Sequence, residues 1–372
     1  MRIVLTSVHS WPGVRRGGER YVHELGAALR RAGHEIVIWS TGLPQGRDEV
    51  LGVPVRRLAA RSVPGRYPDP WGDVAVERAF GLQAFAHLAV PAVRRRFDVW
   101  HATSTGDAAA AAAVGRLPRG PRTVFTDHGF PARRSRSARP DRREHAFVVR
   151  HVDHYVCVSA AAGDYLETDY GRRADVVPPG VRLAAHRPAA ARHPRPALLY
   201  SGSLTEPRKN VPMLLDAVGL LRAAGQEVEL WLLGPGDARP LLDAAGPAAR
   251  AAVTRCGLVD DDELRECYAR AWATVLPSRA ESFGMAVAES LASGTPAVVL
   301  ADGGGPAEIV SSARIGRRCE ATAESLAEAC TQTLDLAADR AVVDDCRDRA
   351  REFDWDASVV PRLLDLYAEC ST

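Results

Sequence analysis

Short apolar runs alternate with helical patterns along the chain, and this alternation limits the fold more than any other feature. One unit shows it clearly: the apolar run from Trp272 to Leu276 leads into the loop ESFG and then into a helical pattern through Val287 and Leu291. Pro296 follows shortly after as a stop signal. A strand that feeds a loop and then a helix is the building unit of a doubly wound sheet, so we expect an α/β fold.

The first half of the chain repeats this unit several times. Residues 19–32 and 74–95 show helical periodicity, the alanine run 108–113 fills another helix, and residues 61–73 form a Pro/Gly-rich loop. We expect strands at residues 2–7, 35–40, 97–101, 123–126, 154–159 and 175–177. The first two strands and the helix between them already make a βαβ unit.

The second half begins after an Ala/Pro/Arg-rich stretch without periodicity, residues 183–196, where we place an interdomain linker. A further βαβ series follows, and a final helix is expected at 359–366 with Asp356 near its start as a cap. We expect its strands at residues 197–200, 227–233, 253–258, 272–276 and 297–300. A chain of 372 residues fits two domains, each with its own core.

Composition describes a soluble globular protein, with 25% charged and 46% hydrophobic residues. No apolar run is long enough to span a membrane, and no secretory signal precedes the first strand, so we expect a cytoplasmic protein. The seven cysteines are dispersed without a CxxC pair, which predicts buried thiols in a reducing compartment and neither a disulfide framework nor a zinc site.

Charge is distributed unevenly along the chain. Residues 1–190 carry 29 arginines against 18 acidic residues, whereas the remainder carries 19 basic against 28 acidic residues. A basic first half fits a domain that meets an anionic acceptor or the inner face of a membrane. Arginines that are merely solvated, including those of the basic loop 133–143, remain the alternative. No basic stripe interleaved with aromatic residues indicates nucleic acid.

The loop ESFG and the helix after it carry two carboxylates, Glu281 and Glu289. A helix that starts after a strand presents free N–H groups and a positive dipole end, and anions bind there. Glu289 lies about two turns inside the helix, so the two carboxylates stand at different levels of one cleft. A ribose can bind one carboxylate and a sugar ring the other, with phosphates between them over Phe283, Gly284 and Met285.

Two further positions in the first half carry ligand-binding chemistry. Gly17 and Gly18 precede a helix, where a glycine pair permits close approach of a phosphate. His128 follows the strand 123–126, at an edge of the sheet where ligands bind, and its imidazole can hydrogen-bond a sugar hydroxyl. A plain turn and a surface histidine are the alternatives.

Lys209 is the only lysine, against 47 arginines. A sequence that uses arginine at every other basic position but keeps one ammonium indicates a site that needs a compact point charge. The pair Asp354 and Asp356 has the spacing of a metal-binding DxD motif, but we expect a helix cap and no metal.

The E-x7-E spacing of Glu281 and Glu289, followed by GTPAVVLADGGGPAEIV, resembles the retaining nucleotide-sugar glycosyltransferases of family 4, of the phosphatidylinositol mannosyltransferase type. The resemblance covers most of the chain and implies the GT-B fold, in which two Rossmann-like domains face each other across a cleft. It implies an acceptor-binding domain at 1–183, joined by a helix at about 356–372 that crosses back, and a nucleotide-sugar-binding domain at 184–355.

Site roles follow from the resemblance residue by residue. It makes Glu281, Lys209 and His128 catalytic, places Gly17 and Gly18 at the donor phosphates, and assigns the nucleobase to the turn at Leu258 and Val259. The remaining donor-binding residues that it implies are Ser203, Arg208, Gly234, Phe283, Gly284, Met285, Ala286 and Glu289.

One position departs from the family pattern. The family usually has arginine where this chain has Ser203, so one of two expected cations is missing. Either Arg208 or an arginine of the other domain compensates, or the donor site is weakened.

The implied reaction moves a hexose from a nucleotide diphosphate sugar to a hydroxyl with retention, without a metal or other cofactor. The acceptor, a lipid headgroup or a small-molecule alcohol, stays open, as do the sugar and the base. A nucleotide-sugar epimerase and a catalytically impaired donor-binding protein are the alternatives. A phosphorylase would need a second lysine for pyridoxal phosphate.

Overall fold

The computed structural model describes the chain except residues 10, 12–16, 42–45, 59–69, 130–138 and 370–372. The chain divides into two compact units, Met1–Gly180 with Trp355–Thr372 (unit 1) and Val181–Asp354 (unit 2). Within the described ranges, no helix combines the length and the apolar character that a bilayer crossing requires. Most of the basic loop 133–143 and of the stretch before Gly17 lies outside the described residues.

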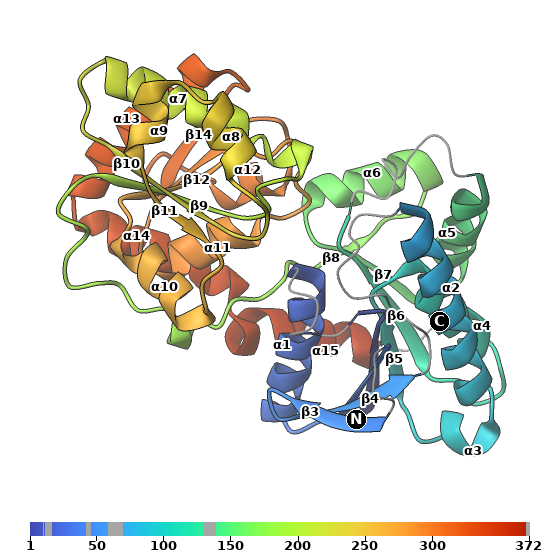
Figure 1. Ribbon diagram of the computed structural model, residues 1–372. Helices are drawn as coiled ribbons and strands as arrows, with labels where there is room; N and C mark the ends of the chain where they lie inside the picture. Colours follow the sequence, from blue (N-terminus) through green and yellow to red (C-terminus); the bar gives the residue numbers. More distant parts are fainter. Residues whose placement is uncertain (10, 12–16, 42–45, 59–69, 130–138, 370–372) are drawn as a thin grey trace. The chain divides into compact units, whose positions relative to one another are not determined.

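In the described part of unit 1, eight strands form one sheet in the order β3-β4-β2-β1-β5-β6-β7-β8 (Figure 1). Neighbouring strands are parallel except β3 and β4, which form an antiparallel hairpin. The bounds are β1 Arg2–Ser7, β2 Glu35–Thr41, β3 Gly46–Val50, β4 Val53–Leu58, β5 Val99–Ala102, β6 Arg122–Asp127, β7 His154–Cys157 and β8 Asp175–Val176. The chain adds β2 to β4 on one side of β1 and then returns to add β5 to β8 on the other side. The strand order therefore reverses between β1 and β5.

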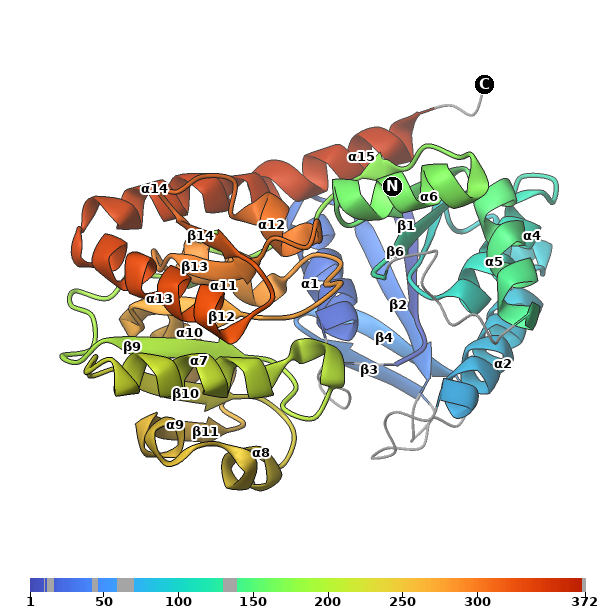
Figure 2. The same cartoon turned by 90° about the horizontal axis from the view of Figure 1, so that it is seen from above.

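Helices cover both faces of this sheet (Figure 2). Successive residues of β1 point to opposite faces, so Ile3 and Leu5 join one core while Val4 joins the other. The first core is closed by α1 Gly17–Arg31 and α15 Val360–Ala368. The second is closed by α2 Pro70–Leu88, α4 Thr105–Gly115, α5 Arg139–His151 and α6 Ala160–Tyr170, and the short α3 Pro91–Arg94 follows α2.

The C-terminal segment belongs to unit 1. A π-helical turn, Trp355–Val359, leads into α15, and the Trp355 indole is buried against α1, where its Nε1 donates to Glu24 Oε2 at 3.0 Å. Gly180 lies against the indole so closely that a Cβ on it would stand 2.1 Å from Trp355 Cδ2. A buried indole cannot move aside, so the fold requires glycine at this position.

Gly180→Ala is therefore expected to lower the free energy of unfolding of unit 1 by about 1–3 kcal/mol, the usual cost of overpacking a core. Thermal and urea unfolding of purified protein measure the change. Gly246→Ala in unit 2 is the matched control, because a Cβ there would meet no atom within 4 Å. Equal melting temperatures for the two variants would contradict the packing described.

Unit 2, which is described throughout, has six parallel strands in the order β11-β10-β9-β12-β13-β14. Their bounds are β9 Ala197–Ser201, β10 Glu229–Leu233, β11 Val253–Gly257, β12 Ala273–Leu276, β13 Ala297–Leu300 and β14 Gly316–Cys319. The helices are α7 Val211–Ala223, α8 Arg239–Ala244, α9 Pro247–Ala252, α10 Asp261–Arg270, α11 Met285–Ala292, α12 Gly305–Ile309, α13 Ala323–Ala338 and α14 Ala341–Ala350. Leu198 and Tyr200 of β9 pack under α7, whereas Leu199 faces α10.

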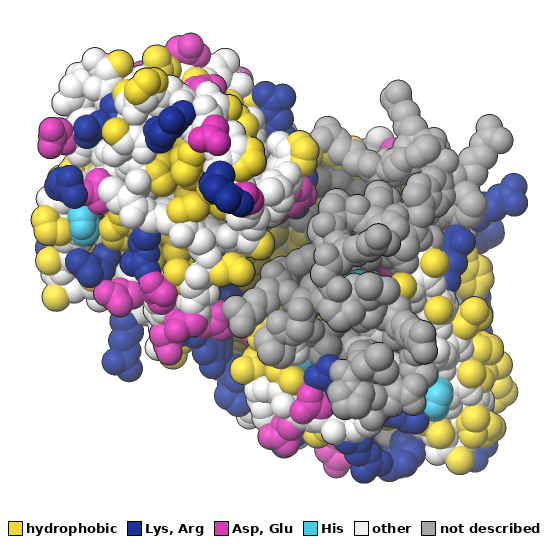
Figure 3. All heavy atoms as spheres, viewed as in Figure 1, with side chains coloured by type: hydrophobic (Ala, Val, Ile, Leu, Met, Phe, Trp, Pro, Cys, Tyr) yellow, Lys and Arg dark blue, Asp and Glu magenta, His cyan; other side chains and the backbone are white. Residues whose placement is uncertain are grey.

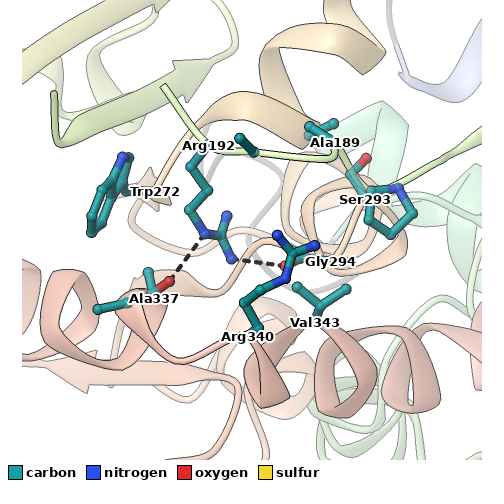
Figure 4. Close-up of a pocket in the computed structure, with 12 residues that line it drawn as sticks. Ala189, Arg192, Trp272, Ser293, Gly294, Ala337, Arg340 and Val343 are labelled. Atoms are coloured by element: carbon teal, nitrogen blue, oxygen red, sulfur yellow. Dashed lines mark hydrogen bonds between the residues drawn. The ribbon is translucent and has the colours of Figure 1, made fainter. Parts of the chain in front are cut away.

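The expected linker is fastened to unit 2 by arginines. Arg192 donates to the carbonyls of Ala271, Gly294 and Ala337 at 2.7, 3.1 and 3.1 Å, at the ends of α10, α11 and α13 (Figure 4). A cation suits helix C-termini, where the dipole is negative. With Arg340 it lines a pocket of about 210 Å³ beside the amino ends of β12 and β13. The hydrogen bonds of Arg192 in this pocket tie the linker segment to unit 2.

Three expectations about local structure are wrong. The helix expected at 74–95 is two helices, because Pro91 starts α3 and holds Val90 extended before it. The loop expected at 61–73 ends earlier, since α2 already begins at Pro70. Asp356 is not the N-cap of α15, which is Val359: it lies inside the π-helical turn, and its carboxylate binds Arg31 of α1 at 2.8 Å.

Three strands and one thiol also differ from expectation. The β3–β4 hairpin and β14 were not expected. Among the described cysteines, Cys256 is exposed whereas Cys157, Cys267, Cys319, Cys330 and Cys346 are buried.

Candidate functional site

The sheet of unit 2 places two loops side by side at its carboxyl edge. The chain adds β10 and β11 on one side of β9 and then returns to add β12 on the other side. Ligands of doubly wound sheets bind where the loops after two such neighbouring strands diverge. The loop after β9 carries the 3₁₀ turn Pro207–Lys209, and the loop after β12 carries Glu281.

These two loops meet in a cluster of charges. Lys209 Nζ lies 2.6 Å and Arg208 Nη1 lies 2.8 Å from the same atom, Glu281 Oε2. The Glu281 and Lys209 side chains are only 12% and 14% exposed. Burial alone would raise the pKa of the Glu281 carboxyl, but Lys209 and Arg208 together hold that pKa below its ordinary value. Glu281 is therefore ionised at neutral pH, with two cations fixed around it.

Asp302 and the glycines after it support the loop that carries Glu281. Ala280 has a positive φ of 50°, and its N–H donates to Asp302 Oδ2 at 2.7 Å. The Gly305 N–H donates to the Glu281 carbonyl at 3.0 Å, and a Cβ on Gly305 would lie 2.3 Å from the Ser282 carbonyl oxygen. Asp302 to Gly305, which follow β13, thus support the backbone of the loop that carries Glu281. The sequence pattern did not reveal this role.

Helix α11 begins directly after this loop, and Gly284 precedes it with φ 99°. A Cβ on Gly284 would stand 2.9 Å from Pro306 Cγ, so the turn requires glycine. Within the described residues, the N–H groups of Met285 and Ala286 have no acceptor in the protein. Phe283 is buried beside them. The helix start therefore offers amide donors next to the charge cluster, as an anion site requires.

Glu289, the second carboxylate of the pattern, lies inside α11 and is 6% exposed. The structure places it on the same helix as the amide donors. Its expected contact with a ribose stays a prediction.

The remaining predicted residues of unit 2 lie at the same edge of the sheet. Ser203 follows β9, and its carbonyl accepts a hydrogen bond from the Tyr200 hydroxyl at 2.7 Å. Gly234 follows β10 with φ 136°, and a Cβ there would lie 1.9 Å from the Gly202 carbonyl oxygen. Leu258, just after β11, is 63% exposed, and Val259 packs on the core beside it.

In unit 1 the structure brings the glycine pair and the histidine together. Gly17 and Gly18 start α1, and a Cβ on Gly18 would lie 3.8 Å from His128 Cδ2. The Tyr21 and His128 rings pack edge to face, with their centroids 4.5 Å apart. Burial lowers the pKa of His128 to about 4 despite the nearby charges of Asp127 and Glu19. The imidazole is therefore neutral at pH 7.

Asp127 holds the turn that carries His128. Its carboxylate accepts hydrogen bonds from the Tyr155 hydroxyl at 2.7 Å and from the Gly129 N–H at 2.8 Å. Since both bonds are buried or half-buried, they fix the backbone on either side of the imidazole. Neither Asp127 nor Tyr155 was predicted as part of the site.

A metal centre is not formed by the described residues, among which no group of three or more His, Cys, Asp or Glu side chains could hold an ion. Asp356 of the DxD spacing is engaged with Arg31 instead.

Each of the two units matches a known protein family. A family model described as Glycosyltransferase Family 4 matches residues 15–185, and one described as Glycosyl transferases group 1 matches residues 195–335. A glycogen synthase of Mycobacterium tuberculosis is 33% identical over 384 residues, covering 95% of this chain and 92% of that protein. A GDP-mannose-dependent alpha-mannosyltransferase of the same species is 28% identical, covering 77% of this chain and 76% of that protein.

Solved structures show the same architecture. A sucrose-phosphate synthase from Thermosynechococcus elongatus superposes with a TM-score of 0.84 at 22% identity, covering 98% of both chains. Anabaena HepE in complex with UDP-glucose superposes with a TM-score of 0.75 at 15% identity, again over 98% of both chains. At these identities the likeness concerns the fold.

Proposed function

Because the chain belongs to the family 4 glycosyltransferases and has two Rossmann-like units of the GT-B type, we propose that it transfers a hexose with retention from a nucleotide diphosphate sugar to an acceptor hydroxyl. The reaction would form a bond between the acceptor oxygen and the anomeric carbon and break the bond from that carbon to the diphosphate. The acceptor enters on the face that the diphosphate leaves, and a leaving phosphate oxygen takes the hydroxyl proton.

The observation that carries this proposal is the charge cluster at the switch point of unit 2. Departure of a nucleoside diphosphate places negative charge on its phosphate oxygens, and fixed positive groups aimed at that charge lower the barrier. Lys209 and Arg208 supply two cations, and the start of α11 supplies amide donors at the same edge. These groups would take over the stabilisation of the leaving group that a metal ion provides elsewhere.

The other predicted residues have roles that fit their positions. Glu281 would bind hydroxyls of the donor sugar, and Glu289 would bind the ribose. Phe283 to Ala286 would cover the phosphates, with Gly234 at the mouth of the site. Leu258 and Val259 would hold the base.

In unit 1, the neutral imidazole of His128 would hydrogen-bond the transferred sugar or the acceptor. Gly17 and Gly18 would leave room beside it for a phosphate or an acceptor.

The composition of one surface of unit 1 indicates the kind of acceptor. Leu82 and Phe85 on α2 and Val90 after it are 71%, 37% and 47% exposed, and Arg95 and Arg96 follow with exposed side chains. Figure 3 shows hydrophobic side chains gathered on the part of unit 1 where Figure 1 draws α2 to α4. Apolar side chains flanked by arginines suit the interface of an anionic membrane. This surface favours a lipid-linked acceptor and peripheral binding at the inner face of a membrane.

A transfer assay tests the function and the acceptor together. Thermal shift with UDP-glucose, ADP-glucose and GDP-mannose identifies the donor. The labelled donor is then offered phosphatidylinositol in vesicles, inositol phosphate or an α-glucan, the acceptor chemistries that the relatives' names suggest. We expect transfer, and most of it to the lipid. Donor binding without transfer would indicate a donor-binding protein, and a changed sugar released without an acceptor would indicate an epimerase.

A further inference from the structure

The pocket of about 210 Å³ in unit 2 has no part in the proposed function. Two residues that line it, Trp272 and Gly294, come just before β12 and β13, whereas the charge cluster follows β9 and β12 at the opposite edge of the sheet. We propose that this pocket binds a small organic anion, a carboxylate on a compact apolar body, through Arg340 and Arg192. The inference does not depend on the proposed function.

Most of the residues that line the pocket are apolar. The Trp272 indole is fixed at one side, because its Nε1 donates to the His193 carbonyl at 2.8 Å. Val343 and Pro188 lie close to Gly294, since a Cβ on that glycine would stand 2.7 Å from Val343 Cγ1 and 3.4 Å from Pro188 Cγ. An apolar cavity of about 150 Å³ is large enough for benzene. This larger pocket therefore has room for an aromatic ring that carries one small polar group.

The charge of Arg192 is already met by the protein. Its guanidinium donates to the three carbonyls at the ends of α10, α11 and α13 and to Thr295 Oγ1 at 3.0 Å. The negative ends of these helices offset the positive charge. Of the N–H groups of this guanidinium, one on Nη2 has no acceptor among the described residues. Arg192 can therefore give one hydrogen bond to a ligand.

Arg340, in contrast, has most of its donors available. Its exposed side chain makes one hydrogen bond, from Nη1 to the Ala190 carbonyl at 2.6 Å, and it pairs with no carboxylate in the part of the chain that the structure describes. Figure 4 shows its guanidinium group next to that of Arg192. Burial lowers the pKa of Arg192, and the positive charge of Arg340 adds to this lowering. The two like charges thus repel each other across the pocket.

A single negative charge suits this arrangement. An anion between the two guanidinium groups would offset their repulsion. The N–H groups on Nε and Nη2 of Arg340 form a planar fork that matches the two oxygens of a carboxylate. Because the helix ends already offset the charge of Arg192, only the charge of Arg340 remains to be met. This balance favours a carboxylate over a doubly charged phosphate.

A ligand-observed NMR titration of the whole protein tests the proposal with matched probes. Benzoate combines the charge with the ring, benzamide keeps the ring without the charge, and acetate keeps the charge without the ring. We expect benzoate to bind about tenfold more tightly than either of the others, the size of one charge-assisted contact or of one buried ring. Phenyl phosphate should bind no more tightly than benzoate.

Variants place the bound benzoate. Arg340→Gln is expected to weaken its binding about tenfold, and the substitution should leave the fold intact because the side chain is exposed. Arg318→Gln removes another exposed arginine, on β14, as the matched control and should leave benzoate binding unchanged. Lys209→Ala should also bind benzoate like the wild type, because its site lies at the other edge of the sheet.

Four results would overturn the proposal. They are benzoate that binds no more tightly than benzamide or acetate, phenyl phosphate that binds more tightly than benzoate, Arg340→Gln that binds benzoate like the wild type, and Arg318→Gln or Lys209→Ala that loses as much affinity as Arg340→Gln. The last result with Lys209→Ala would place benzoate in the charge cluster. None of these results would alter the proposed transfer reaction, which the donor titrations test.

Discussion

Replacing Lys209 with alanine is expected to lower kcat/KM for the donor by about 10²–10³-fold. A unit charge about 4 Å from a developing phosphate charge, at an effective dielectric near 20, contributes about 4 kcal/mol, and each 1.36 kcal/mol is a factor of ten in rate. The fold should survive, because Arg208 still pairs with Glu281 in the variant. Initial rates over a range of donor concentrations measure the effect, with circular dichroism as the check on folding.

Two further variants sharpen this result. Arg314→Ala removes an exposed cation that pairs with Asp345 before β14, so its kinetics should match the wild type. Lys209→Arg keeps the charge but spreads it over a larger group, and we expect it to recover only part of the loss. Unchanged kinetics for Lys209→Ala would remove the ammonium from the mechanism.

Glu281→Ala is expected to abolish measurable turnover, with a loss of at least about 10²-fold in kcat, the usual effect of removing a polar group that acts on the transition state. The carboxylate is buried between Lys209 and Arg208, so its removal takes away the proposed contact to the donor sugar and also the oxygen that both cations share. Glu281→Gln separates charge from shape. We expect it to be nearly as impaired, because the amide cannot hold two cations.

The pH dependence has a definite sign. Lys209 and Arg208 lower the pKa of Glu281 in the folded protein. The stabilisation that this carboxylate provides is therefore complete above its ordinary pKa and is lost as the pH falls through the lowered value. Activity that depends on ionised Glu281 should stay constant from neutral pH down to the ordinary range of a glutamate. In the Glu281→Gln variant, any loss of activity at acidic pH that is due to this carboxyl group should disappear.

Glu328→Ala, an exposed carboxylate on α13, is the matched control for Glu281 and should change neither rate nor pH profile. If Glu281→Ala turns over donor at the wild-type rate, the carboxylate takes no part in transfer. If the Glu281→Gln profile keeps an acidic limb identical to that of the wild type, another group titrates there.

The alternation of apolar and helical patterns was sufficient to predict most strands and the α/β class. A buried parallel strand such as β13, AVVL, is a continuous apolar run, which a single sequence displays. The hairpin strand β3 is mostly exposed and carries the polar sequence GRDEV, so no apolar period marked it. The break at Pro91 was visible in the sequence and should have divided the expected helix.

For the site, the sequence could place residues after strands but could not pair them. The family resemblance implied that Lys209, Glu281 and Gly234 bind one donor, and the structure places all three at the carboxyl edge that parallel strands share. Two contacts could be seen only in the structure. Arg208 and Lys209 bind the same oxygen of Glu281, which lies 72 residues after Lys209 in the chain. The Asp302 carboxylate accepts a hydrogen bond from the Ala280 N–H. Both depend on loop conformations with unusual φ values, which periodicity does not encode.

The central claim is that unit 2 binds a nucleotide diphosphate sugar through the Arg208–Lys209 turn and the start of α11. A crystal structure of the wild type with the donor that gives the largest thermal shift tests it most directly. We predict phosphate oxygens within about 3 Å of Lys209 Nζ and of the Met285 and Ala286 amides, the range of charge-assisted hydrogen bonds, with Glu281 turned towards the sugar. A donor bound elsewhere, with Lys209 and Arg208 still closed on Glu281, would contradict the account.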